Sequence, residues 1–136
     1  MTQEQKDLLL KDLCARLPYF TKVQIKNEIV VLDSICDDDG YHFNFIGDDR
    51  EGVNIENIKP YLFPLSSMTD EQKNSFPFSY SFLEALIDDG VYFDEDECIT
   101  LNDMIYVIQW CYKNHFDIYG LIPMGLAIDA TGLNIY

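Results

Sequence analysis

Residues 21–46, TKVQIKNEIVVLDSICDDDGYHFNFI, decide the fold of this chain. Residues 21–26 and 41–46 alternate between two faces, and residues 28–35 between them are rich in isoleucine and valine. A period of two and a supply of β-branched side chains are typical of strands. The stretch therefore predicts three successive β-strands.

Short turns connect these strands. Lys26-Asn27-Glu28 can form a tight hairpin turn, and Asp37-Asp38-Asp39-Gly40 is a strong turn because glycine accepts positive φ and aspartate tolerates it. A polar turn at 47–52 precedes residues 53–58, which can add a fourth strand. Turns this short predict a small antiparallel meander, and such a meander can also curl into a small barrel.

The N-terminal segment predicts a helix. Thr2 can cap it, and an apolar stripe with helical spacing follows until Pro18 stops it. Asp12 and Arg16 lie four residues apart with the acid first, an order that favours a helix.

A second, longer helix is predicted over residues 101–114. Thr100 is its N-cap, and Asp103 occupies position N3 of a capping box. Apolar side chains cover most of its circumference and leave only a narrow polar stripe, so we expect this helix to be mostly buried. It is the predicted central packing element.

The rest of the chain predicts short elements. Residues 59–68 are irregular, Thr69 begins a short helix, Ser79 or Ser81 caps another, and residues 129–132 can turn a small hairpin. With 136 residues, 48% of them hydrophobic, the chain predicts one domain spanning residues 1–136 with a well-supplied core. The predicted class is α+β, with the sheet packed against the N-terminal helix and the long helix.

The charge is strongly acidic, with 24 acidic against 9 basic residues and a formal net charge of −15. The first 35 residues are balanced, so all of the net charge belongs to the later part of the chain. A chain this acidic repels phosphate backbones and anionic membranes. We therefore expect neither nucleic acid nor membrane as a direct partner, whereas a basic protein partner is favoured.

The cysteines and histidines offer a possible metal site. Cys98, Cys111 and His115 are its best candidates, because the last two lie four residues apart on one helical face. Against this, the four cysteines form no Cys-x-x-Cys pair. We adopt the alternative of core thiols and a histidine at a helix C-terminus, and predict neither metal nor cofactor. The N-terminus carries no apolar signal segment, which predicts a cytoplasmic protein with free thiols.

No catalytic residues are predicted, since the chain lacks a Gly-x-Ser-x-Gly elbow, a phosphate-binding glycine loop and a Ser-x-x-Lys motif. Two groups of residues are candidate binding positions. One is an acidic run that can hold a divalent ion loosely or remain a solvated loop, and the other is an aromatic pair among prolines that serves either as a core plug or as a partner groove. These candidates are Asp94, Glu95, Asp96, Glu97, Tyr61 and Phe63.

Three segments carry a resemblance: DLCARLPY at 12–19, IKPYLFPLSSM at 58–68, and HFD with GLI and GLA within 115–127. Together they resemble a group of short uncharacterised proteins of gut anaerobic bacteria, often found in prophage or mobile-element neighbourhoods. A glycine follows Leu-Pro-Tyr in that group, whereas Phe20 does here, so we expect a different turn into the first strand. The resemblance implies a bacterial, cytoplasmic and mobile-element context and no site residues.

Three functions follow as hypotheses. The first is a non-enzymatic acidic protein-interaction module of a bacterial mobile element. It is favoured because the chain has enough apolar residues for a core and carries its net acidic charge in the part after residue 35. The second is a DNA mimic that inhibits a nucleic-acid-binding protein by placing carboxylates where phosphates are expected. The third is a small metal-binding protein or enzyme that uses His115, Cys98, Cys111 or the acids at 94–97.

Overall fold

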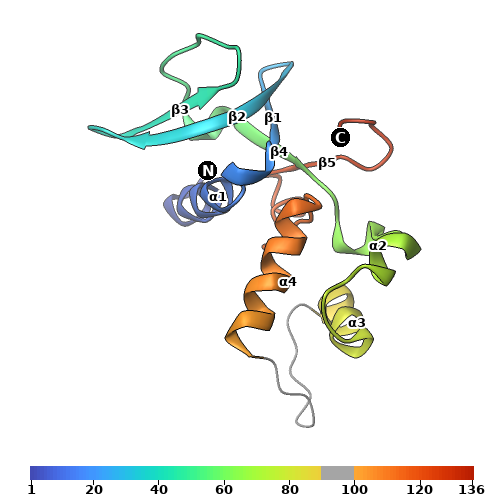
Figure 1. The fold of residues 1–136 in the computed structure, drawn as a ribbon. Helices are drawn as coiled ribbons and strands as arrows, with labels where there is room; N and C mark the ends of the chain where they lie inside the picture. The colour runs from blue at the N-terminus through green and yellow to red at the C-terminus, as the bar shows by residue number, and fades with distance from the viewer. Residues whose placement is uncertain (90–99) are drawn as a thin grey trace.

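The computed structural model describes residues 1–89 and 100–136 (Figure 1). The N-terminal region carries a helix and the first three strands, a fourth strand follows, and the C-terminal half is mainly helical. The elements are α1 (Gln3–Ala15), β1 (Lys22–Ile25), β2 (Glu28–Asp37), β3 (Tyr41–Phe45), β4 (Ile58–Leu62), α2 (Asp70–Asn74), α3 (Tyr80–Asp89), α4 (Leu101–Lys113) and β5 (Ile128–Asp129), with 3₁₀ turns at Leu17–Tyr19, Ile55–Asn57 and Leu65–Ser67. The predicted α+β class is confirmed.

The five strands form one sheet in the order β3-β2-β1-β4-β5. The first four strands pair antiparallel, and β5 runs parallel to β4. The sheet is open and not a barrel, because β3 and β5 lie at opposite edges. A two-residue β5 is also too short to carry the pairing that closure needs.

The fourth strand is displaced from its predicted position. Residues 55–57 form a 3₁₀ turn whose start is capped by the Asn54 side chain, which accepts a hydrogen bond from the Glu56 amide (3.1 Å). The strand follows at Ile58–Leu62 and includes Pro60, so the predicted irregular segment begins later. β5 pairs with Tyr61 and Leu62, and among the described residues no strand pairs with Pro60 on that side, where a missing N–H costs little. The predicted hairpin at 129–132 is replaced by this parallel pairing.

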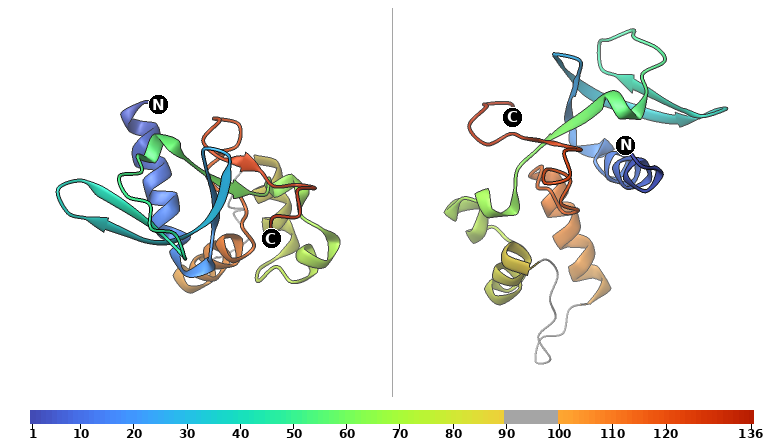
Figure 2. Two further views of the ribbon diagram at one scale, coloured as in Figure 1. Left: turned by 90° about the horizontal axis from the view of Figure 1, so that it is seen from above. Right: turned by 180° about the vertical axis from the view of Figure 1, so that it is seen from behind.

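A first core cluster lies between α1 and the sheet. α1 places Leu9 and Leu13 against Val23 of β1, Leu32 of β2 and Phe43 of β3, all of them buried. Figure 1 and Figure 2 show α1 beneath the β2–β3 hairpin, with α3 and the start of α4 at the other end of the molecule. Thr2 caps α1 as predicted, and Gln5 completes a capping box with it.

A second core cluster joins α3 and α4. Phe82, Leu83 and Leu86 of α3 pack against Val107 and Cys111 of α4. The prediction that α4 is mostly buried is wrong. Its opposite side is open to solvent, with exposed fractions of 78% for Leu101, 43% for Ile105 and 38% for Ile108. The capping box of Thr100 and Asp103 is formed as predicted.

Candidate functional site

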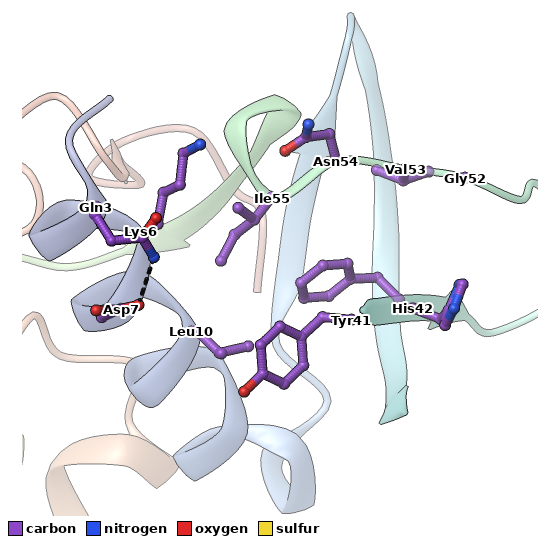
Figure 3. A pocket seen from close by; sticks show the side chains of 11 residues that line it. Gln3, Lys6, Asp7, Leu10, Tyr41, His42, Gly52, Val53, Asn54 and Ile55 are labelled. Atoms are coloured by element: carbon purple, nitrogen blue, oxygen red, sulfur yellow. Dashed lines mark hydrogen bonds between the residues drawn. The ribbon is translucent and has the colours of Figure 1, made fainter. Parts of the chain in front are cut away.

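An open pocket of about 360 Å³ lies between α1, β3 and residues 52–55 (Figure 3). Its apolar wall includes Leu10 from α1, Tyr41 from β3 and Ile55 from the 3₁₀ turn. Figure 3 shows the side chains of Leu10 and Tyr41 facing one another, with Ile55 above them. We call this the α1–β3 pocket.

The α1 side of the pocket follows from helical spacing. Gln3, Asp7 and Leu10 lie on one face, and the Gln3 amide donates a hydrogen bond to the Asp7 carboxylate (2.9 Å). Lys6 bridges the rim, since its ammonium lies 2.7 Å from the carboxylate of Glu56. This ion pair holds the pKa of Glu56 below its ordinary value. The pocket therefore has an apolar floor and a polar rim whose groups are partly paired with one another.

The β3 side follows from strand alternation. Phe43 points into the first core cluster, and Tyr41 on the same face reaches beyond it and is 53% exposed. His42 points to the other face, where its ring lies 2.7 Å from the Asp38 carbonyl oxygen. Tyr41 is thus an aromatic side chain at the mouth of the pocket with much of its surface open to solvent.

Carboxylates surround this end of the molecule. Six acidic residues occur between positions 37 and 51: Asp37, Asp38, Asp39, Asp48, Asp49 and Glu51. Arg50, the single lysine or arginine in that interval, donates to Asp48 (2.8 Å) and also bonds Glu28. Arg50 holds the pKa of Asp48 below its ordinary value. The acidic turn at 37–39 has no basic side chain within ion-pair distance in the described structure, so its charge faces solvent.

Two further depressions adjoin the α1–β3 pocket. One of about 320 Å³ shares His42, Phe43 and Gly52 with it and continues along β3 to Asn44. The other, of about 460 Å³, lies across residues 51–53 and is lined by Lys26, Glu28 and Arg50 among others. The first of these depressions therefore extends the concave surface along β3, whereas the second contains no residue of that strand.

A buried polar cluster lies on the other side of α1. Asp12 and Arg16 are both fully buried, and the guanidinium donates to the carboxylate at 2.6 and 3.0 Å. Arg16 also donates to the Phe116 carbonyl (2.7 Å) and lies over the Tyr112 ring (4.7 Å). Its Nη1 has no hydrogen-bond partner among the described residues, and burial raises the pKa of Asp12 despite the hydrogen bonds from Arg16. The cluster joins the two halves of the molecule, and we interpret it as structural.

Tyr136 forms a second set of contacts between the sheet and the end of α4. The Tyr136 ring stacks on His115, with centroids 3.6 Å apart. Its hydroxyl accepts a hydrogen bond from the Lys22 amide (2.9 Å) and donates one to the Tyr61 carbonyl (3.0 Å). Burial, with Arg16 and Lys22 nearby, lowers the pKa of His115 to about 4. His115 is therefore neutral near pH 7.

The predicted binding residues lie in different places. Asp94, Glu95, Asp96 and Glu97 fall outside the described residues. Tyr61 lies within β4 and is only 5% exposed, so it offers almost no surface to a partner. Phe63 is half-buried against Phe116 and Tyr136, and it lines a separate pocket of about 260 Å³. Binding at Phe63 stays a prediction.

The predicted metal candidates do not meet in the described structure. Cys98 lies outside it, and the described residues contain no group of three His, Cys, Asp or Glu side chains arranged for a metal ion. Burial raises the pKa of Cys111 to about 12, so this thiol stays protonated. Cys14 and Cys36 are exposed and unpaired.

The α1–β3 pocket was not among the sequence candidates. Its residues come from three segments, α1, β3 and 52–55, and no local motif relates them. The one usable signal was Tyr41, an aromatic residue directly after the acidic turn, on a face shared with Phe43 and Phe45. Comparisons of this chain with protein-family models, curated proteins and solved structures found no match. Within residues 1–89 and 100–136, no helix is long and apolar enough to cross a bilayer.

Proposed function

We propose that this chain is a non-enzymatic protein-interaction module of a bacterial mobile element, and that it binds a basic protein at the β3 end of the molecule. The observation that carries the proposal is the juxtaposition of the α1–β3 pocket with the solvent-facing acidic turn at 37–39.

The pocket supports a binding role because of its lining. Binding energy at protein interfaces is concentrated in a few aromatic or apolar anchors that enter desolvated pockets. Leu10, Tyr41 and Val53 provide such a lining, and Tyr41 is already exposed without a partner. The pocket volume of about 360 Å³ suits one large apolar side chain together with part of its backbone.

The charge supports a basic partner. Fields of one sign steer an oppositely charged protein toward its site and disfavour partners of the same sign. Asp37, Asp38 and Asp39 are exposed at the tip of the β2–β3 hairpin, and Glu51 is exposed beside the depression that continues the pocket. A basic surface that approaches the pocket meets these carboxylates first.

The polar groups of the pocket support binding over catalysis. Lys6 is paired with Glu56, and Asp7 accepts a hydrogen bond from Gln3. The His42 ring is held by the Asp38 carbonyl and points away from the space between α1 and β3 (Figure 3). Lys6, Asp7 and His42 are therefore already engaged by neighbours in the chain.

The proposal is tested by affinity capture from bacterial lysate with mass spectrometry, at about 0.05 M and at about 0.5 M salt. The hairpin variant, Asp37→Asn with Asp38→Asn and Asp39→Asn, is compared with an equally charged control variant. The control, Asp70→Asn with Glu71→Gln and Glu84→Gln, removes three exposed carboxylates from α2 and α3. We expect a basic protein that wild type and the control retain at low salt, and that the hairpin variant loses.

Capture of the same proteins by both variants would contradict binding at the β3 end. Turnover of a substrate by the purified chain would contradict the non-enzymatic role. If the captured protein binds nucleic acid and DNA displaces it, the DNA-mimic hypothesis becomes the better description of the same surface.

A further inference from the structure

We infer that β3 is a docking edge, at which an extended, lysine- or arginine-rich segment of a partner protein adds as a further strand and places one apolar side chain in the α1–β3 pocket. The inference rests on the proposed function and specifies the partner's chemistry and the mode of recognition.

The first step is the free edge of β3. The strand is the last in the sheet order, and its inner side is fully paired with β2 over Tyr41–Phe45. On its outer side, the described residues form only one isolated bridge, between Phe45 and Asp48. An edge strand presents backbone N–H and C=O groups that can pair with another extended chain.

The second step is the concave surface beside that edge. The α1–β3 pocket and the depression at Asn44 share His42, Phe43 and Gly52, so together they follow the strand. Residues 51–53 form the far wall. A hollow that runs along a strand edge suits an extended chain better than a helix, because an extended chain is narrow and pairs with the edge along its length.

The third step is the alternation of side chains on the incoming strand. Successive side chains of a strand point to opposite faces. A residue that points toward α1 meets the apolar lining of Leu10, Tyr41 and Ile55, whereas its two neighbours point away from the pocket. One apolar anchor among polar or charged neighbours is therefore the pattern that fits.

The fourth step is the charge of those neighbours. The carboxylates of 37–39 lie next to the start of β3, and Glu51 lies beside its middle. Arg50 is already bonded to Asp48 and Glu28, so the described structure leaves these carboxylates without a basic partner. Lysine or arginine on the incoming strand supplies the missing charge.

A second copy of the chain fits this edge less well. Pairing of two β3 edges would bring two acidic hairpins together, in a molecule whose formal net charge is −15. The like charges of the two hairpins would repel each other, and charged residues near an edge strand are a common protection against such self-pairing. A heterologous basic segment is therefore the occupant to which we commit.

The test uses a capped synthetic peptide of alternating lysine and threonine with a single central leucine. Binding is followed by fluorescence anisotropy and by backbone amide chemical shifts of the isotope-labelled full chain. We expect shift changes centred on Tyr41–Phe45 and on the α1 side of the pocket. Binding should weaken about tenfold with Tyr41→Ser and change little with Tyr41→Phe, because the aromatic wall remains.

Two peptide controls separate strand addition from general attraction. N-methylation of alternate peptide amides removes hydrogen-bond donors and keeps the charge, and one of the two alternating patterns should abolish most of the binding. Replacement of the central leucine by serine should weaken binding about tenfold. Equal binding by both N-methylated patterns and the parent peptide would overturn strand addition.

The remaining outcomes distinguish this inference from the proposed function. No peptide binding, together with salt-sensitive lysate capture that depends on 37–39, would overturn strand addition and leave the interaction module standing. Failure of both experiments would overturn both proposals. Concentration-dependent dimerisation with shift changes at β3 would assign the edge to a second copy, and shift changes confined to α4 would place the peptide elsewhere.

Discussion

Phe20 holds its backbone in the left-handed region, with φ 54° and ψ 46°, directly after the 3₁₀ turn at Leu17–Tyr19. This conformation is costly for a bulky residue, and the ring gains little in return because it is 68% exposed. A glycine adopts the same conformation freely.

We therefore predict that Phe20→Gly raises the free energy of unfolding by about 1 kcal/mol. The variant removes the backbone strain, and the greater entropy of glycine in the unfolded chain offsets part of that gain. Urea unfolding measures the difference. Phe20→Ala is the control, because it removes the ring and keeps the strain. Equal stabilisation by both variants would show that the ring, and not the backbone, is the cause.

Asp12 and Arg16 show that the energetic role of an ion pair depends on its burial. The same i, i+4 spacing on a surface contributes only a few tenths of a kcal/mol. Here both side chains are fully buried, and Arg16 also bonds Phe116 and covers Tyr112. Removal of one partner leaves an uncompensated charge away from water, which is far more costly than loss of the pair.

We predict that Asp12→Ala lowers the free energy of unfolding by about 3 to 5 kcal/mol. The double variant Asp12→Leu with Arg16→Met should be more stable than Asp12→Ala, because it removes both charges and keeps apolar volume. Denaturant unfolding of the two variants checks this order. A double variant that is less stable than the single would show that the other bonds of Arg16 dominate.

At the scale of elements, α4 has two unlike faces. Val107 and Cys111 pack against α3, whereas Leu101, Ile105 and Ile108 form a stripe on the solvent side. All five side chains are apolar, so hydrophobicity alone does not separate the two faces. The separation arises because α3 covers one side of α4 and no described element covers the other.

We predict that Leu101→Gln changes the free energy of unfolding by less than about 0.5 kcal/mol, since its side chain is 78% exposed. Val107→Ala should cost about 1 to 3 kcal/mol, since it opens a cavity in the second core cluster. Thermal and denaturant unfolding of the two variants measure the contrast. A large loss with Leu101→Gln would show that the stripe is covered in solution.

At the scale of the whole molecule, the C-terminal residues Ile135 and Tyr136 are tied to the sheet and to the end of α4. Tyr136 stacks on His115 and bonds to β1 and β4, and Lys22 of β1 donates to the Ile135 carbonyl. His115 lies at the end of α4, and its carbonyl accepts a hydrogen bond from the Phe63 amide after β4. The C-terminal tail therefore connects the sheet with the helical half.

Because His115 is partly buried in this contact, we predict that it contributes to the free energy of unfolding at neutral pH and that this contribution is lost in acid. The pKa of His115 is about 4 in the folded chain and near 6.5 in the unfolded chain, so the unfolded state binds more protons between these values. Its contribution is complete above about pH 6.5 and is lost as the pH falls toward about 4. Protonation would place a cation near Arg16 and Lys22.

His115→Asn is the test, because asparagine does not ionise and tolerates the φ of 61° at this position. We expect the variant to be less stable than wild type at pH 7, since the stacking is lost, and to lose less stability between about pH 6.5 and pH 4.5. Unfolding curves at several pH values measure this slope. Parallel pH profiles for the two proteins would refute the role of His115.

The sequence by itself determined the local features. Thr2, Thr69 and Thr100 cap helices where predicted, and the turns at 26–28 and 37–40 separate strands where predicted. These features depend on interactions between residues a few positions apart, which the order of residue types encodes directly. The net charge follows from composition in the same way.

Only the tertiary structure decided what depends on distant partners. It buried Asp12 with Arg16, covered one face of α4, and placed Pro60 in a strand by pairing β4 with β1. The α1–β3 pocket likewise unites segments that no sequence period relates. The physical reason is that burial and pairing belong to surfaces in contact, and a side chain's own identity does not specify which surface lies against it.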